Sequence, residues 1–317
     1  MKDWKGFSKG VNLGGWLSQC DYSEDRLSNF IVEEDFKKIA DMGFDHVRVP
    51  VDYNILEDDK GGYIESGFAH IAFAMDTARK YGLNVLLDLH RTAGYMFDAG
   101  VGETGFFEDE ALQERFYRLW IEFAKRFGSD PEHIAFELLN EVTDKEYGPI
   151  WNRIAKECIK RIRQIAPDVV ILVGSYYNNS VMSVVDLDPP YDDKIVYNFH
   201  CYDPLLFTHQ HAGWVDDPNI DKDMSFEESK VDEQYFEDLF ADAIKKAQEN
   251  DTVLYCGEYG VIDCADAADS LKWFAAINAV YKKHGIGHAV WSYKEMDFGI
   301  MDAKYDGMRD ELLKNLL

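Results

Sequence analysis

Short apolar runs alternate with helix-forming segments along the whole chain, and this alternation limits the fold more than any other feature of the sequence. The runs are rich in Val, Ile and Leu, as strands buried on both faces should be. The eight runs are Gly10–Trp16, His46–Val51, Val85–His90, Ile134–Asn140, Val169–Gly174, Ile195–His200, Thr252–Gly257 and His288–Trp291. Regular alternation of this kind predicts βα units around a parallel sheet.

Eight strands and eight helices predict a closed (β/α)8 TIM barrel, an α/β fold whose active site lies at the C-terminal ends of the strands. The expected helices are Glu33–Met42, Phe68–Tyr81, Ala111–Phe127, Ile150–Ile165, a short one at Ser180–Val185, Glu233–Glu249, Ala265–His284 and Asp310–Leu317. We expect residues 1–317 to form a single catalytic barrel domain, with a long loop insertion at about 203–232.

Polar or aromatic residues stand at nearly every predicted strand end, where a barrel would gather them into one site. They are Asn12 and Trp16, Arg48, Asp88 and His90, Asn140 and Glu141, Gly174 and Ser175, His200 and Tyr202, Glu258, and Trp291. This clustering predicts an active site.

Glu141 and Glu258 follow the fourth and seventh runs, so they could face one another across the mouth of the barrel. Breaking a glycosidic bond needs an acid for the leaving oxygen, and retaining enzymes add a carboxylate nucleophile about 5 Å away. One glutamate at a strand end is most often a surface ion pair. Two of them among polar neighbours favour catalysis.

Several nearby residues could support this pair. Arg48 could keep a carboxylate ionised, or it could simply pair with Asp88 in the core. His90 and His200 could bond sugar hydroxyls or orient the acids, although a buried histidine is often only structural.

Aromatic residues could serve the site as well. Tyr202 could hydrogen-bond the nucleophile and Trp291 could lie under a sugar ring; otherwise both are core aromatics. Two long loops carry more aromatic residues. Trp214 lies in the loop from Asp203 to about Asp232. Tyr95, Phe97, Phe106 and Phe107 lie in the loop Arg91–Asp109, where they either stack on sugars or fold back onto the barrel rim.

Bulk composition favours a neutral ligand. The net charge is −26, from 59 acidic and 33 basic residues, and this repels nucleic acids and anionic membranes. The five cysteines lack CxxC spacing, so we expect reduced thiols. The N-terminus lacks a signal-peptide core, so we expect a cytoplasmic monomer, or a secreted one if a leader has been removed.

A metal site is the main chemical alternative, since Asp88, His90, His200 and Glu258 could ligate zinc or manganese. The sequence lacks a His-x-His in its first run and lacks HExxH.

A set of ordered motifs closely resembles glycoside hydrolase family 5, the cellulase family, over essentially the whole chain. The motifs are Gly10-Val-Asn-Leu-Gly-Gly-Trp16, Arg48-Val-Pro, Leu87-Asp-Leu-His90, Leu139-Asn-Glu141, Asn198-Phe-His200-Cys-Tyr202, Gly257-Glu258-Tyr-Gly and Val290-Trp291. Within the family the chain is most similar to the clostridial endoglucanase C type.

The resemblance implies double displacement, with Glu141 as acid/base, Glu258 as nucleophile and neither a metal nor an organic cofactor. It also implies that Asn140 holds the 2-hydroxyl of the reacting sugar, that Arg48 and Tyr202 tune Glu258, and that His200 lies near Glu141. Arg91 departs from the family pattern, because many relatives have a second histidine there. The segment after Tyr202 is also shorter than the subdomain of the clostridial type.

We therefore expect a retaining endo-β-glucanase that cleaves β-1,4 bonds of cellulose-type or mixed-linkage β-1,3-1,4-glucans. Asn12, Trp16, Trp214 and Trp291 are the expected substrate-binding residues. The alternative within the family is an exo-acting β-glucosidase or β-1,3-glucanase. More distant alternatives are an inactive carbohydrate-binding barrel and a metal-dependent barrel hydrolase.

Overall fold

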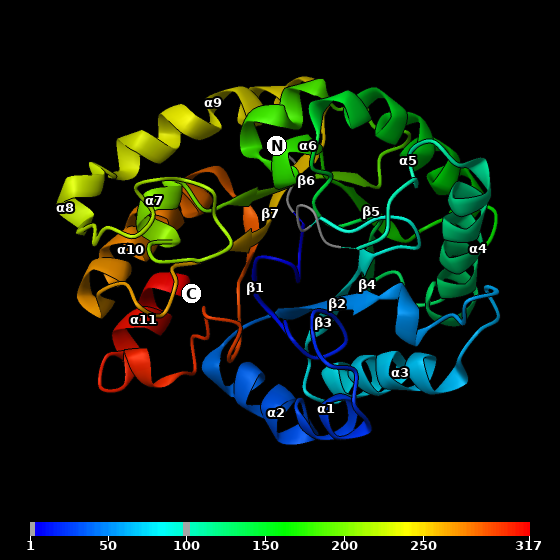
Figure 1. Ribbon diagram of the computed structural model, residues 1–317, viewed down its shortest axis with the longest axis horizontal. Helices are drawn as coiled ribbons and strands as arrows, with labels where there is room; N and C mark the ends of the chain where they lie inside the picture. Colours follow the sequence, from blue (N-terminus) through cyan, green and yellow to red (C-terminus); the bar gives the residue numbers. More distant parts are fainter. Residues whose placement is uncertain (1–3, 98–101) are drawn as a thin grey trace.

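The computed structural model describes residues 4–97 and 102–317 and contains a closed barrel of eight parallel strands (Figure 1). Each strand pairs with the next along the chain, and β8 pairs with β1. The strands are β1 (Lys9–Asn12), β2 (His46–Asp52), β3 (Asn84–Arg91), β4 (Ile134–Glu137), β5 (Val170–Val173), β6 (Ile195–Cys201), β7 (Val253–Tyr259) and β8 (Gly287–Val290). The predicted TIM barrel is confirmed.

Helices surround the barrel and connect its strands (Figure 1). The α-helices are α1 (Glu24–Asn29), α2 (Glu33–Met42), α3 (Glu65–Lys80), α4 (Glu110–Phe127), α5 (Gly148–Ile162), α6 (Tyr176–Asn179), α7 (Leu205–Thr208), α8 (Phe226–Ser229), α9 (Glu233–Glu249), α10 (Ala267–His284) and α11 (Arg309–Leu316). The short 3-10 helices are η1 (Tyr53–Ile55), η2 (Lys145–Tyr147), η3 (Val181–Asp186) and η4 (Ala303–Tyr305).

Helix α4 shows why the spacing of apolar residues predicted helices in this chain. Its apolar residues recur at spacings of three and four, so one face buries Phe116, Trp120 and Phe123 against the barrel. The Asp109 side chain accepts a hydrogen bond from the Ala111 N–H and so caps the first turn.

The elements differ from the prediction mainly at the ends of strands and in the loops. Strand β1 ends at Asn12 rather than Trp16, because the chain turns through Gly15, whose φ is +70°. Strand β4 ends at Glu137, although the N–H of Asn140 still donates to the Leu89 carbonyl. The short helix predicted after β5 is the 3-10 helix η3, and the sequence pattern missed α1, α6, α7 and α8.

Alternate residues of the strands point into the barrel and form layers. The lower layer contains an apolar cluster, and Trp4 packs against it, with its ring stacked 4.1 Å from that of Phe7. Its buried members are Phe7, Leu86, Ala135, Leu172, Val196, Val253, Tyr255 and Ala289. Two residues further along the strands the interior becomes polar, with Asn12, Arg48, Asp88, Glu137 and Asn198 all fully buried.

A bulge in β7 changes which side chain faces the barrel mouth. In the pairing with β6, Phe199 lies opposite Cys256 but His200 lies opposite Glu258, so β7 contains one extra residue at Gly257. Tyr255 faces the interior, and strict alternation would turn Glu258 outward. The extra residue instead brings Glu258 into the mouth.

The long loop after β6 is well structured rather than extended. It contains α7 and α8, and Phe207 is fully buried beneath it. In the described parts of the chain, none of the helices is both long and apolar enough to cross a membrane.

Candidate active site

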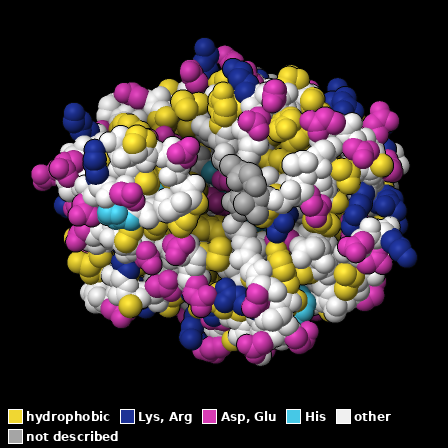
Figure 2. Space-filling model, in the orientation of Figure 1, with side chains coloured by type: hydrophobic (Ala, Val, Ile, Leu, Met, Phe, Trp, Pro, Cys, Tyr) yellow, Lys and Arg dark blue, Asp and Glu magenta, His cyan; other side chains and the backbone are white. Residues whose placement is uncertain are grey.

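The candidate site lies at the C-terminal ends of the strands, on the face that carries α7 (Figure 1). Figure 2 shows this face hollowed near its centre, with acidic and histidine side chains at the bottom of the hollow. The hollow is where the barrel rule places a catalytic site.

Arg48 on β2 is fully buried at the centre of a charge network. Its guanidinium bonds Glu137 through Nε at 2.7 Å, Glu258 through Nη1 at 2.6 Å and Asp88 through Nη2 at 3.0 Å. Burial alone would lower the pKa of Arg48, but the three carboxylates outweigh it and raise the pKa well above its usual range. Arg48 therefore contacts both Asp88 and the strand-end glutamate Glu258.

Glu258 is held ionised from several sides. It accepts hydrogen bonds from Arg48 at Oε1 and from the Tyr202 hydroxyl at Oε2, the latter at 3.0 Å. Burial would raise the pKa of Glu258, but His200, Arg48 and His90 outweigh it and lower the pKa to about 2. Glu258 is thus a carboxylate throughout the neutral range, and this is the state that a nucleophile requires.

Glu141 stands on the loop after β4 in a left-handed conformation, with φ of 39°. Its backbone carbonyl accepts a hydrogen bond from the Tyr95 hydroxyl at 2.7 Å, and that hydroxyl also accepts from the Thr143 N–H. Its side chain is only 12% exposed and contacts His200 and Asn178. The loop thereby turns the carboxyl group back over the barrel mouth.

His200 lies between the two glutamates. Its Nδ1 is 2.8 Å from Glu141 Oε1 and 3.6 Å from Glu258 Oε2. Burial opposes the charged imidazole, but Glu258 and Glu141 outweigh it and raise the pKa of His200. One carboxylate oxygen of Glu141 and one of Glu258 lie within 4.8 Å of each other.

His90 and Trp291 form an adjoining wall. Their rings are nearly parallel, 5.8 Å apart, and Trp291 is 7% exposed. His90 Nδ1 contacts Asp88 at 2.6 Å, and its Nε2 contacts Gln19 Oε1 at 3.2 Å. Gly14 allows this wall to form, since a Cβ there would lie 2.8 Å from the Trp291 ring.

Asn140 presents a free donor to the site. Its Oδ1 accepts a hydrogen bond from Arg48 at 2.9 Å, which orients the amide. The Nδ2 group is buried and has no hydrogen-bond partner among the described residues, so it can donate to a ligand.

Two of the expected substrate-binding residues lie too deep to contact a substrate. Asn12 is fully buried, donates to the carbonyls of Gly257, Ala289 and Val290, and accepts from Arg48. Trp16 is 1% exposed, packs against Phe36, and donates through Nε1 to the Leu27 carbonyl. Both therefore brace the structure instead.

The loop aromatics divide into two groups. Tyr95, Phe106 and Phe107 fold back and are buried, as in the alternative left open by the sequence, whereas Phe97 is partly exposed and edge-on to His90. Residues 98–101 of that loop lie outside the described residues. In the other loop Trp214 is 61% exposed.

Trp214 connects to the site through a chain of ring contacts. The centroids of the Trp214 and His209 rings are 6.4 Å apart, and those of the His209 and Tyr202 rings are 4.9 Å apart. Burial lowers the pKa of His209 to about 4, so this link is neutral near pH 7.

The residues that could bind a metal in the structure differ in part from the set that the sequence suggested, which was Asp88, His90, His200 and Glu258. In residues 4–97 and 102–317 one trio, Glu141, His200 and Glu258, is close enough to hold an ion. Asp88 is not part of it, because it is bound to Arg48 and His90. The trio is the same cluster that could act as an acid and a nucleophile.

Sequence reasoning missed two polar residues of the site. Glu137 is fully buried on β4, accepts from Arg48 and from Asn198 Nδ2 at 2.8 Å, and has a pKa raised by burial, which the charge of Arg48 only partly offsets. A charged residue inside an apolar run was the available signal. Asn178, which donates to Glu141, had no comparable signal, because it lies in an irregular turn.

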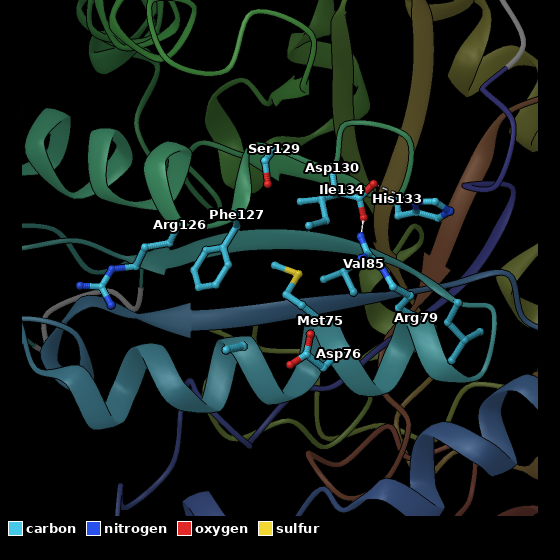
Figure 3. A pocket seen from close by; sticks show the side chains of 12 residues that line it. Met75, Asp76, Arg79, Val85, Arg126, Phe127, Ser129, Asp130, His133 and Ile134 are labelled. Atoms are coloured by element: carbon cyan, nitrogen blue, oxygen red, sulfur yellow. Dashed lines mark hydrogen bonds and ion pairs between the residues drawn. The ribbon is translucent and has the colours of Figure 1, made fainter.

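A pocket of about 240 Å³ lies away from this chemistry, at the start of β3 and β4 and between α3 and α4 (Figure 3). Val85 lies near the start of β3 and Ile134 begins β4 there, and Arg79 pairs with Asp130 across the pocket. It is at the opposite end of the barrel from Glu141 and Glu258.

The arrangement can perform acid and nucleophilic chemistry within one cleft. An oxygen separation within 4.8 Å fits the spacing of about 5 Å in retaining glycosidases and not the 6.5–9.5 Å of inverting ones. Both glutamates contact His200, but Glu258 also contacts the Arg48 guanidinium, whereas Glu141 is partly exposed and contacts the neutral amide of Asn178.

We predict that Arg48→Lys lowers the free energy of unfolding by about 3–5 kcal/mol, because one ammonium group cannot satisfy three buried carboxylates. The kcat should also fall. Urea unfolding at pH 7 measures the first effect. The control is Arg126→Lys, since Arg126 makes a forked pair with Glu65, which is 72% exposed. That change should cost no more than about 1 kcal/mol. Equal losses in the two variants would contradict a central role for Arg48.

Comparisons with known proteins agree with this geometry. The family model Cellulase (glycosyl hydrolase family 5) matches residues 5–297. The chain is 56% identical to Cellodextrinase A of Ruminococcus flavefaciens, over 89% of this chain and 84% of that protein. It is 36% identical to Endoglucanase C of Acetivibrio thermocellus, over 98% of each.

Solved structures are similar over the same length. Thermotoga maritima Cel5A, in complex with cellobiose, superposes with a TM-score of 0.83 at 25% identity, covering 99% of this chain and 98% of that one. The family match spans nearly all of the described barrel and both glutamates. The chain therefore belongs to glycosyl hydrolase family 5, the cellulase family, and is a glycoside hydrolase.

Proposed function

We propose that the protein is an endo-acting β-glucanase that cleaves β-1,4 bonds with retention of configuration, Glu141 serving as acid/base and Glu258 as nucleophile. The main observation in support is the pair of glutamates. One carboxylate oxygen of each lies within 4.8 Å of the other, and the two side chains have different neighbours. Environments that separate two carboxylates in this way assign them different roles.

In the first step, Glu258 attacks the anomeric carbon while Glu141 gives its proton to the leaving oxygen. The hydrogen bonds from Arg48 and Tyr202 fix the Glu258 oxygens before attack. The free Nδ2 of Asn140 is available to donate to the 2-hydroxyl of the reacting sugar, where hydrogen bonds strengthen in the transition state.

In the second step, Glu141, now ionised, takes a proton from water as the water attacks the glycosyl–enzyme bond. His200 contacts both glutamates, so it can respond electrostatically as negative charge passes from Glu258 to Glu141 in the first step and returns to Glu258 in the second. Trp291 and His90 supply the wall against which the reacting sugar lies.

Soluble glucans and cello-oligosaccharides are the substrates that we propose. The names of the relatives, Cellodextrinase A and Endoglucanase C, support β-1,4-glucan chemistry. Trp214, exposed at the rim, offers a ring for a sugar further along the chain. The exo-acting alternative would need the loops to close the cleft at one end.

A product time course tests the proposal. Barley mixed-linkage glucan, carboxymethyl cellulose, laminarin and cellobiose are incubated with wild type and with Glu258→Gln, with and without chelator, and the products are separated by chromatography. We expect early mixed oligosaccharides from the first two substrates, from wild type only and regardless of chelator. Glucose alone from laminarin or cellobiose would favour the exo reading. Binding without cleavage would indicate a carbohydrate-binding barrel, and chelator-sensitive activity restored by zinc would indicate a metal enzyme.

The pH profile tests the two roles. Glu258 must be ionised, and its lowered pKa of about 2 keeps it so above about pH 4. Glu141 must be protonated for the first step, so kcat/KM should fall on the alkaline side. We expect a bell-shaped profile with an acidic to neutral optimum. A rate that rises steadily to about pH 9 would contradict the assignment.

A further inference from the structure

Three consecutive residues after β5 have left-handed backbones, with φ of 52° at Tyr177, 54° at Asn178 and 55° at Asn179. Such a conformation is costly for tyrosine and tolerated by asparagine. Strain of this kind persists only where surrounding contacts enforce it. Here the Tyr177 N–H donates to the Thr143 carbonyl, and the Asn178 N–H donates to the Val142 carbonyl.

This turn therefore pairs with the loop that carries Glu141. The side chains of its two asparagines contact different residues of the site. Asn178 Nδ2 donates to Glu141 Oε2 at 3.1 Å, and the buried Asn179 amide lies 3.5 Å from His200 Nε2. His200 itself contacts the other oxygen of Glu141, Oε1. Both oxygens of Glu141 thus depend on groups that this one turn positions.

From this geometry we infer that Asn178 is a positioning residue for the acid/base step, held in place by the strained turn Tyr177–Asn179. The inference rests on the proposed role of Glu141. A donor at Oε2 restricts rotation of the carboxyl group and favours its ionised form, the form needed in the second step.

The pH consequence has a definite sign. Among the described residues, the titratable groups that face Glu141 are His200, Tyr95, Tyr202 and, across the cleft, Glu258. Removing the Asn178 donor disfavours ionised Glu141, so the protonated acid persists to higher pH. The alkaline limb of the profile should therefore move upward.

Two variants keep the left-handed backbone while changing the side chain. Asn178→Gly removes the amide, and Asn178→Asp replaces the donor with a carboxylate of the same shape. The matched control is Asn29→Asp, because the exposed Asn29 amide also donates to a carboxylate, that of Asp25 at 2.8 Å on α1. Thermal unfolding verifies that each variant is folded. If the glycine variant does not fold, the inference is tested with Asn178→Asp alone.

Two substrates separate positioning of the acid from a merely structural role. Cellotetraose needs a proton on its leaving oxygen, whereas 2,4-dinitrophenyl β-cellobioside releases a stable anion without one. For Asn178→Gly we expect kcat/KM to fall about tenfold on cellotetraose, the effect of one hydrogen bond to a charged group, and less than about twofold on the aryl glycoside.

For Asn178→Asp we expect the alkaline limb on cellotetraose to move up by about one pH unit, because the new carboxylate repels ionised Glu141. Asn29→Asp should change neither quantity. An equal fall on both substrates with an unmoved profile, or no fall at all, would overturn the inference.

Glu141→Ala separates this inference from the proposed function. If Glu141 is the acid/base, azide should accelerate this variant on the aryl glycoside and give a glycosyl azide of retained configuration. Failure of that rescue would refute the role of Glu141 itself. Rescue of Glu141→Ala together with unaltered Asn178 variants would refute only the role of Asn178.

Discussion

One buried guanidinium faces three carboxylates inside the barrel, and the candidate site depends on this interaction. Arg48 on β2 contacts Asp88 on β3, Glu137 on β4 and Glu258 on β7, all nearly or fully buried. Left without a counter-charge, such carboxylates would be protonated or would destabilise the fold. The ion pairs of Arg48 link β2 to β3, β4 and β7 inside the barrel, and the same guanidinium keeps Glu258 ionised at the barrel mouth.

The site's asymmetry follows from where the network stops. Glu258 lies at its edge, next to Arg48, His90 and His200, and its pKa is lowered to about 2. Glu141 lies one step further out, on a loop held by Tyr95 and by the turn at Tyr177–Asn179. We propose that this difference in placement, rather than any difference in residue type, separates the two roles.

The sequence was sufficient for the parts that follow from periodicity. Alternating runs predicted the barrel, and polar strand ends led to Glu141, Glu258 and Arg48, which the structure brings together. It was insufficient where local geometry departs from periodicity. Trp16 was expected to bind substrate, but the chain turns after Asn12 and buries it. Glu137 was hidden in an apolar run, and Asn178 reaches Glu141 only through positive φ angles that hydrophobic patterning does not encode.

The most direct test of the account is to trap the covalent intermediate. A 2-deoxy-2-fluoro cellobioside with a 2,4-dinitrophenyl leaving group should form a slowly hydrolysed glycosyl–enzyme, since the fluorine slows both steps and the leaving group restores the first. Peptide mass spectrometry should then find one equivalent of the sugar on Glu258, and none in Glu258→Gln. A label on Glu141 or another residue, or release of the dinitrophenolate at a steady rate without any labelled peptide, would contradict the central role given to the Arg48–Glu258 pair.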